Sequence, residues 1–213
     1  MSALLRQLFF WLVVRPAVTV GLGLHVRHRE RLPVKGPAIL AANHNSHLDT
    51  VTLMVLLKPA LLSKTRPVAA ADYFLKNGLI AWFSQQIIGI IPIERGGRKV
   101  GVDPLAPASQ ALGDGSVLVI FPEGTRGEPE QFKEWKSGVA HLAKKHPEVP
   151  VIPVFLHGLG KTLPKGAFIP VPFFLDVFVG EPLYGREDHK AFMAQYVERM
   201  MALRAEGDFP EWQ

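Results

Sequence analysis

Short apolar runs alternate with longer helix-like segments along most of this 213-residue chain. The apolar runs are bounded by turn residues and have the length of strands, so each predicts a strand; they cover residues 38–42, 67–71, 87–93, 117–121, 151–156 and 173–179. Helices are predicted at residues 48–57, 77–86, 105–112, 138–145 and 190–204. The alternation predicts an α/β fold, a single domain with a mostly parallel central sheet flanked by helices. Because Gly89 and Pro92 interrupt the run at 87–93, we expect a short or edge strand there.

The first 31 residues follow a different pattern. Residues 4–14 are almost wholly apolar, Arg15 and Pro16 interrupt the run, and residues 17–24 are apolar again. A basic cluster then closes the segment, with His25, Arg27, His28, Arg29 and Arg31. A membrane-spanning helix needs roughly 20 predominantly apolar residues. The interrupted run therefore favours two short helices, or one kinked helix, lying in or dipping into one leaflet, with the basic cluster at the lipid headgroups.

A helix packed on the core and a transmembrane anchor are the two alternatives for this segment. We divide the chain into a membrane-associating segment, residues 1–31, and a folded domain, residues 32–213. The domain has ample apolar content for a core, because 48% of all residues are hydrophobic. The net charge of +5 suggests an anionic partner, such as nucleic acid, an anionic bilayer or a phosphorylated substrate. The chain has no cysteine, which excludes disulfides, a thiolate nucleophile and cysteine-ligated metals, and suits a cytosolic setting.

Polar side chains follow three of the predicted strands, where each strand ends. His44 and Asp49 follow the first strand, Arg95 follows the run at 87–93, and Glu123 and Arg126 follow the strand at 117–121. Parallel strands bring their carboxyl ends to one edge of a sheet, where ligands bind. A histidine held by a carboxylate is a general base that works near neutral pH. Arginine forks match a phosphate, and the backbone around Gly124 and Thr125 can present N–H groups to an anion. We therefore expect a base beside a phosphate-binding surface.

Competing motifs fail on inspection. No G-x-S-x-G elbow is present, and the Gly-Lys-Thr at residues 160–162 lacks the earlier glycine of a P-loop, because Phe155 occupies that position. The spacing of His44, His47 and Asp49 matches no standard metal motif, so we expect no metal. The aromatic residues sit in apolar runs and are not interleaved with basic residues, which argues against a nucleic-acid partner.

Four segments together resemble the glycerolipid acyltransferases, the enzymes that acylate glycerol 3-phosphate and lysophosphatidic acid. The first, at residues 43–49, carries the His-(four residues)-Asp block. The second runs from Gly89 to Arg95, and the third is Phe-Pro-Glu-Gly-Thr-Arg at residues 121–126. The fourth is the apolar run around a proline at residues 151–154. A His-x₄-Asp block alone is a weak signal, whereas four blocks in this order make coincidence improbable.

The resemblance implies an acyltransferase domain at residues 32–213 and a role for each matched residue. His44 would take the proton from a free hydroxyl of the acceptor, and Asp49 would orient the imidazole and stabilise its charged form. Arg95 and Arg126 would hold a phosphate, while Glu123, Gly124 and Thr125 would shape the acceptor site. The donor would be acyl-CoA or acyl-carrier protein, used as a co-substrate with no cofactor. His47 is expected to be structural.

The expected acceptor is a lysophospholipid, 1-acylglycerol 3-phosphate, and the product is phosphatidic acid. We expect such an enzyme to be membrane-associated at the cytoplasmic face, through its N-terminal segment. Two alternative functions stay open: acylation of another acceptor, such as glycerol 3-phosphate, a lyso-aminolipid or a glycolipid, and a non-catalytic lipid-binding or membrane-tethering role. Two residue roles stay open as well. Arg95 could be a solvated loop residue, and Arg126 could be a surface ion-pair partner. The sequence leaves undecided whether Glu123 contacts the acceptor or pairs with an arginine.

Overall fold

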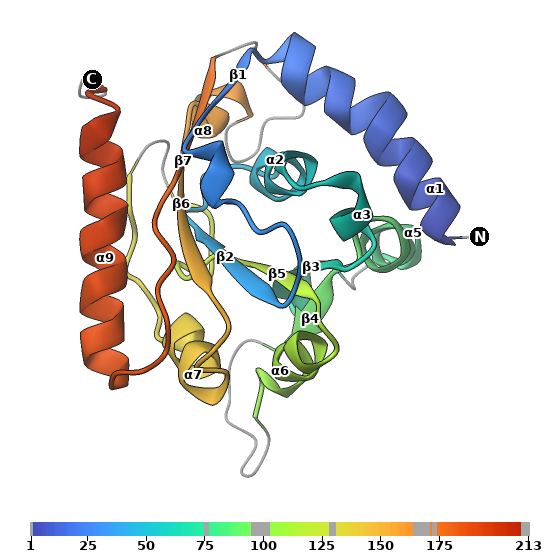
Figure 1. Ribbon diagram of the computed structural model, residues 1–213. Helices are drawn as coiled ribbons and strands as arrows, with labels where there is room; N and C mark the ends of the chain where they lie inside the picture. Colours follow the sequence, from blue (N-terminus) through green and yellow to red (C-terminus); the bar gives the residue numbers. More distant parts are fainter. Residues whose placement is uncertain are drawn as a thin grey trace.

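The computed structural model describes residues 2–74, 77–94, 103–127, 131–163, 171 and 174–209. Within these residues, seven strands form one sheet in the order β1-β7-β6-β2-β5-β3-β4. Helices cover both of its faces, which gives three layers (Figure 1). Among the described strands, β6 and β7 pair antiparallel and the other neighbours pair parallel. The strands are β1 (Leu24–Arg27), β2 (Ala38–Ala42), β3 (Thr65–Ala70), β4 (Ile91–Ile93), β5 (Val117–Ile120), β6 (Val151–His157) and β7 (Leu175–Val179).

The central strands β2 and β5 are buried on both faces, which explains their continuous apolar sequences. Their alternate side chains enter two separate clusters. Leu40 and Val119 contribute to the cluster on one face, and Ile39 and Leu118 contribute to the cluster on the other. The register pairs Ala41 of β2 with Ile120 of β5, so the two strands end side by side. The loops that follow them are therefore neighbours.

The first face of the sheet is covered by α2 (Leu48–Leu56), α3 (Pro59–Leu62) and the N-terminal helix, which comprises α1 (Ser2–Phe9) and the π-helical turns η1 (Phe10–Val14) and η2 (Ala17–Gly21). The second face is covered by α6 (Ala106–Gly113), α7 (Gly138–Lys145) and α9 (His189–Glu206). Shorter helices complete the connections: η3 (Arg29–Arg31), α4 (Ala71–Phe74), α5 (Gly78–Phe83), η4 (Ser84–Ile88) and α8 (Leu159–Thr162).

The N-terminal helix runs on through Pro16 without a break. Wide π-type turns take up the proline, and the backbone N–H of Arg15 donates to the carbonyl of Phe10, five residues back. One side of the helix is buried on the domain, through Arg6, Phe10, Val14 and Val18. The guanidinium of Arg6 donates to the carbonyl oxygen of Thr65 at 2.7 Å. The other side exposes apolar residues, namely Leu4, Leu5, Leu8, Trp11, Leu12, Val13 and Val20.

The segment Leu4–Gly21 is long and apolar enough to cross a membrane, which is weak evidence for membrane association. Only 22% of that window is buried inside the protein. The helix therefore has features of both a core-packing helix and a membrane-associating helix. One of its faces packs on the core, and the opposite face is apolar and uncovered.

Strand β1 was not predicted, because its residues were grouped with the basic cluster after the apolar segment. It pairs with β7, so the sheet begins before residue 32. Several of the basic side chains contact the domain. His28 Nε2 lies 2.8 Å from a carboxylate oxygen of Glu206, and Arg31 pairs with Glu181 at 2.8 Å. The strand predicted at 38–42 is β2 with the same ends, and the other predicted strands are present with shifted ends. The run at 87–93 divides into the end of η4 and the short edge strand β4.

Candidate active site

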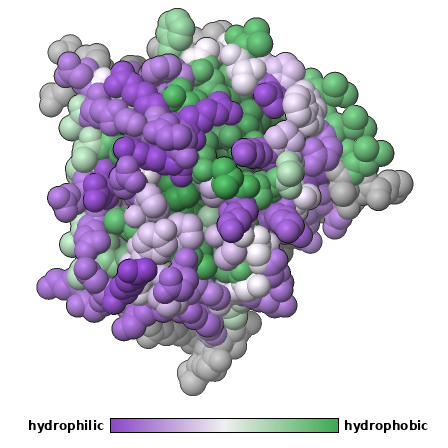
Figure 2. Space-filling view, in the orientation of Figure 1, coloured by the Kyte–Doolittle hydropathy of each residue, from purple (hydrophilic) through white to green (hydrophobic). Residues whose placement is uncertain are grey.

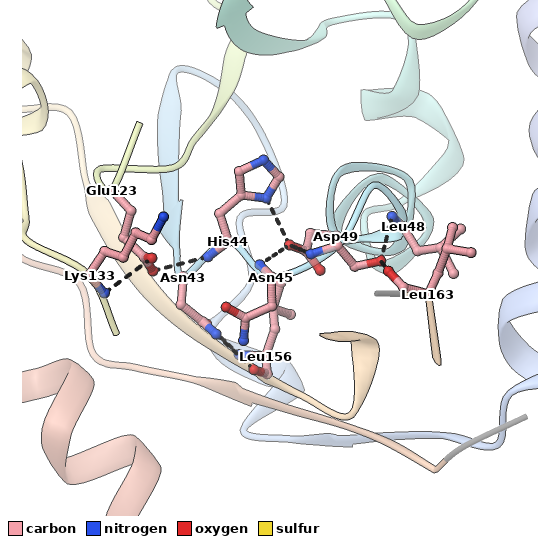
Figure 3. Close-up of polar contacts among 10 residues, drawn as sticks. Asn43, His44, Asn45, Leu48, Asp49, Glu123, Lys133, Leu156 and Leu163 are labelled. Atoms are coloured by element: carbon pink, nitrogen blue, oxygen red, sulfur yellow. Dashed lines mark hydrogen bonds and ion pairs between the residues drawn. The ribbon is translucent and has the colours of Figure 1, made fainter. Parts of the chain in front are cut away.

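The loops after β2 and β5 form a polar cluster at the carboxyl edge of the sheet (Figure 3). The first loop carries Asn43 to His47 and leads directly into α2. The second, residues 121–127, follows β5. The backbone N–H of Gly127 donates to the carbonyl of His44 at 2.8 Å, which joins the loops.

His44 and Asp49 form a hydrogen-bonded pair, with 2.8 Å between imidazole Nδ1 and carboxylate Oδ2. Asp49 is fully buried in the first turn of α2. The same Oδ2 accepts the backbone N–H groups of Asn45 at 2.7 Å and Ser46 at 2.8 Å. Three donors on one oxygen fix the carboxylate, and this in turn fixes the tautomer of the neutral imidazole. With the proton on Nδ1, the basic lone pair is on Nε2.

The ring of His44 is also held from its face. It stacks on Phe121, with ring centroids 4.1 Å apart and planes inclined by 17°. The imidazole keeps 19% of its surface exposed, whereas the Asp49 side chain keeps 1%. The base therefore stands at the surface of the site, and the carboxylate that orients it lies beneath. Figure 3 shows the second ring nitrogen on the side of the ring away from Asp49.

The side chain of Asn43 attaches the same loop to β6. Its amide nitrogen donates to the carbonyl of Leu156 at 2.8 Å, and its amide oxygen accepts the N–H of Leu156 at 2.7 Å. Ser46 is tied in a similar way, because its hydroxyl donates to the carbonyl of Leu163 and accepts the N–H of Leu48. Sequence reasoning assigned no role to Asn43, Ser46 or Phe121. The matched blocks contained a signal for all three, since Asn43 and Ser46 lie within the first block and Phe121 begins the third.

Glu123 is buried, with 3% of its surface exposed, and its two oxygens accept backbone N–H groups. One oxygen accepts from His44 at 3.1 Å and the other accepts from Lys133 at 3.3 Å. Burial raises the pKa of Glu123 to about 7, an effect that the two N–H groups and Lys133 oppose and Asp49 reinforces. Both bonds are to backbone N–H groups, and a contact of Glu123 with the acceptor or with an arginine stays a prediction.

The turn at Gly124 and Thr125 directly follows Glu123 in the chain. Gly124 adopts a left-handed backbone with φ of +70°, and its N–H closes the turn on the carbonyl of Phe121 at 2.9 Å. A Cβ atom at Gly124 would lie 2.9 Å from Nζ of Lys136, a cation that sequence reasoning missed because it stands outside the matched blocks. Thr125 is exposed.

Arg126 is partly buried near the histidines of the first loop. Burial, and then electrostatic repulsion from Arg126 and His44, lower the pKa of His47 to about 4. His47 is therefore neutral at physiological pH. Arg95 lies outside the described residues, so its role stays a prediction. The described residues contain no group of three or more histidine, aspartate or glutamate side chains able to hold a metal ion.

The sequence matches the model of the acyltransferase family over residues 23–157, more than half of the chain. The chain belongs to this family. The match begins at the residue before β1 and ends with β6, so it includes both loops of the site. The resemblance read from four sequence blocks and the α/β fold are both confirmed.

Two relatives of this chain are 1-acyl-sn-glycerol-3-phosphate acyltransferases. A chloroplast 1-acyl-sn-glycerol-3-phosphate acyltransferase of Arabidopsis thaliana is 32% identical over 146 residues, covering 68% of this chain and 38% of the relative. The 1-acyl-sn-glycerol-3-phosphate acyltransferase of Pseudomonas aeruginosa is 26% identical over 186 residues, covering 87% of this chain and 68% of the relative. The chain spans less than half the length of the plant relative.

The crystal structure of the 1-acyl-sn-glycerophosphate acyltransferase PlsC from Thermotoga maritima has a similar fold. The TM-score is 0.75, and the alignment covers 99% of this chain and 81% of that one. Sequence identity is 19%, so this likeness supports the fold. The coverage extends over the N-terminal helix as well as the sheet.

Proposed function

We propose that the protein moves a fatty acyl group from an acyl thioester to the free hydroxyl of 1-acylglycerol 3-phosphate, which yields phosphatidic acid. Membership in the acyltransferase family supports the reaction class, and the names of the relatives support the acceptor. The observation that carries the mechanism is the His44–Asp49 pair, with Asp49 fixed by two further backbone donors.

In this mechanism, Nε2 of His44 removes the hydroxyl proton as the acceptor oxygen attacks the thioester carbonyl carbon. Asp49 stabilises the imidazolium that forms. The tetrahedral adduct then collapses, the C–S bond breaks, and the imidazolium returns its proton to the leaving thiolate. General-base assistance of this kind is worth roughly 10²–10⁴-fold in rate. The transfer is direct, so it requires no covalent acyl-enzyme.

The acceptor phosphate would lie against Arg126 and the turn at Gly124 and Thr125, with Arg95 as a second cation. An arginine presents a planar fork of donors that matches phosphate oxygens. Nζ of Lys136, packed against Gly124, adds positive charge to the same turn. The donor would be acyl-CoA or acyl-carrier protein, and its supply favours a site on the cytoplasmic face of the membrane.

Membrane attachment would use an apolar surface shared by two helices. The outer side of the N-terminal helix contributes leucines and Trp11, and α5 contributes Leu79, Ile80 and Trp82. The rings of Phe9 and Phe83 lie 5.3 Å apart between centroids, so the two helices are in contact. Figure 2 shows hydrophobic side chains along the edge of the molecule where Figure 1 draws α1. Acceptor and product are lipids, so an enzyme held in this way would meet them at the bilayer.

The test is a panel of acceptors assayed with purified protein, acyl-CoA and, separately, acyl-carrier protein thioester. The panel contains 1-acylglycerol 3-phosphate, glycerol 3-phosphate, a lyso-aminolipid and a glycolipid. We expect transfer to 1-acylglycerol 3-phosphate, and activity confined to a non-phosphorylated acceptor would overturn the proposal. His44→Ala should lose activity by at least about 10²-fold. Wild-type rates in that variant would remove His44 as the base.

A further inference from the structure

Glu123 stands in the loop after β5, yet its side chain points into the protein. Its carboxylate joins three segments: its own loop, the loop after β2 at His44, and the segment before α7 at Lys133. Both oxygens are already engaged by backbone N–H groups, and 3% of the residue is exposed. A carboxylate in this position has little surface left to offer a bound acceptor.

The groups behind Glu123 also belong to the interior. Tyr196, on α9, is fully buried, and its pKa is raised by that burial and further by the negative charge of Glu123. Trp135 packs edge-on against Tyr196, with ring centroids 5.3 Å apart. Among the described residues, the charges that act on Glu123 are those of Asp49 and Lys133. Glu123 therefore lies between the histidine loop and the core beneath α9.

The loop that carries Glu123 holds His44 in three ways. Glu123 accepts the backbone N–H of His44, Gly127 donates to its carbonyl, and Phe121 stacks on its ring. Asp49 then sets the tautomer from the opposite side. Removing the carboxylate would release the backbone of His44 and leave two partly buried N–H groups, those of His44 and Lys133, without their acceptors. A displacement of about 1 Å at a reacting group can cost about 10²-fold in rate.

We propose that Glu123 is a positioning residue that fixes His44 for catalysis and does not bind the acceptor. The proposal rests on the function given above, in which His44 is the base. It assigns the glutamate of the Phe-Pro-Glu-Gly-Thr-Arg block to the geometry of the base, and leaves Arg126 and the following turn to the acceptor.

The kinetic test compares Glu123→Ala, Glu123→Gln and the control Glu134→Ala, whose side chain is exposed in the neighbouring segment. We expect kcat to fall by about 10²-fold in Glu123→Ala while the KM for 1-acylglycerol 3-phosphate stays within about threefold. Glu123→Gln should fall less, because its amide oxygen still accepts one N–H. The control should behave as wild type. A raised KM with wild-type kcat at saturation would show acceptor binding and overturn the proposal, as would wild-type kinetics in both variants.

A second measurement does not depend on turnover. Amide hydrogen exchange should quicken at both His44 and Lys133 in Glu123→Ala and at one of the two in Glu123→Gln, while the amides of Asn45 and Ser46 stay protected by Asp49. Unchanged exchange at His44 and Lys133 would refute the positioning role. If wild-type protein transfers no acyl group, or His44→Ala stays active, the proposed function fails, and the exchange result still decides whether Glu123 holds the loop. Glu123→Gln decides the matter if the alanine variant does not fold.

Discussion

Replacing two outward leucines of the N-terminal helix should weaken membrane binding without weakening the fold. Leu8 is 46% exposed and Leu12 is 70% exposed, so serine at both positions removes apolar surface that faces away from the domain. The buried contacts of the helix, at Phe10, Val14 and Val18, remain in place. The double variant Leu8→Ser/Leu12→Ser therefore separates attachment to lipid from folding.

The size of the effect follows from the exposed surface. The two exposed fractions together amount to about one whole leucine side chain. Full burial of such a side chain is worth ~2 kcal/mol. If both leucines enter the acyl-chain region, their loss should lower the partition coefficient by about 30-fold, since 1.4 kcal/mol is a factor of ten.

The assay is cosedimentation with vesicles of phosphatidylcholine and phosphatidylglycerol. The control is Met201→Ser, a similarly exposed apolar position at 47% on α9, which covers the opposite face of the sheet. Thermal unfolding of both variants should match wild type. Undiminished vesicle binding by the double variant, or equal loss in the control, would show that this surface does not contact lipid.

Two further predictions concern the acceptor site and the backbone. Arg126→Ala should raise the KM for 1-acylglycerol 3-phosphate by about 10-fold or more, because a charged hydrogen bond is worth ~1.5–3 kcal/mol, and should change the KM for acyl-CoA little; equal changes in both would count against a phosphate contact. Gly89→Ala should lower the free energy of unfolding by ~1–2 kcal/mol, because φ at Gly89 is +77° and the new Cβ would lie 2.8 Å from Nη1 of the buried Arg6. Gly113→Ala, with open space at its Cβ, is the matched control, and equal stability of the two variants in urea would refute the strain.

Local signals were sufficient for the central strands and the loops after them. The apolar runs that became β2 and β5 end in polar residues, and their parallel pairing brings His44, Asp49 and Glu123 together as expected. Strand β1 had no comparable signal. It has four residues, includes His25 and Arg27, and owes its conformation to pairing with β7, some 150 positions later in the chain.

Two further features depend on backbone geometry and on contacts that the linear sequence does not show. Pro16 was expected either to divide the N-terminal segment into two helices or to kink one helix, and wide π-type turns let a single helix continue past it. The resemblance implied that Glu123 shapes the acceptor site, which stays a prediction, and the side chain of Glu123 points inward. Its inward direction depends on backbone N–H groups of His44 and Lys133, which become neighbours only after folding.

The buried contact between Arg6 and Thr65 makes the N-terminal helix an integral part of the domain and not a removable anchor. Phe10, Val14 and Val18 share one cluster with Met54 and Leu61, so a truncation before residue 24 would uncover the core of the first face. A shortened protein made for easier handling would then aggregate through newly exposed core, and its loss of lipid binding would report damage to the fold. To increase solubility, the exposed leucines of the N-terminal helix that face away from the sheet should be replaced by polar residues, and the helix should be kept.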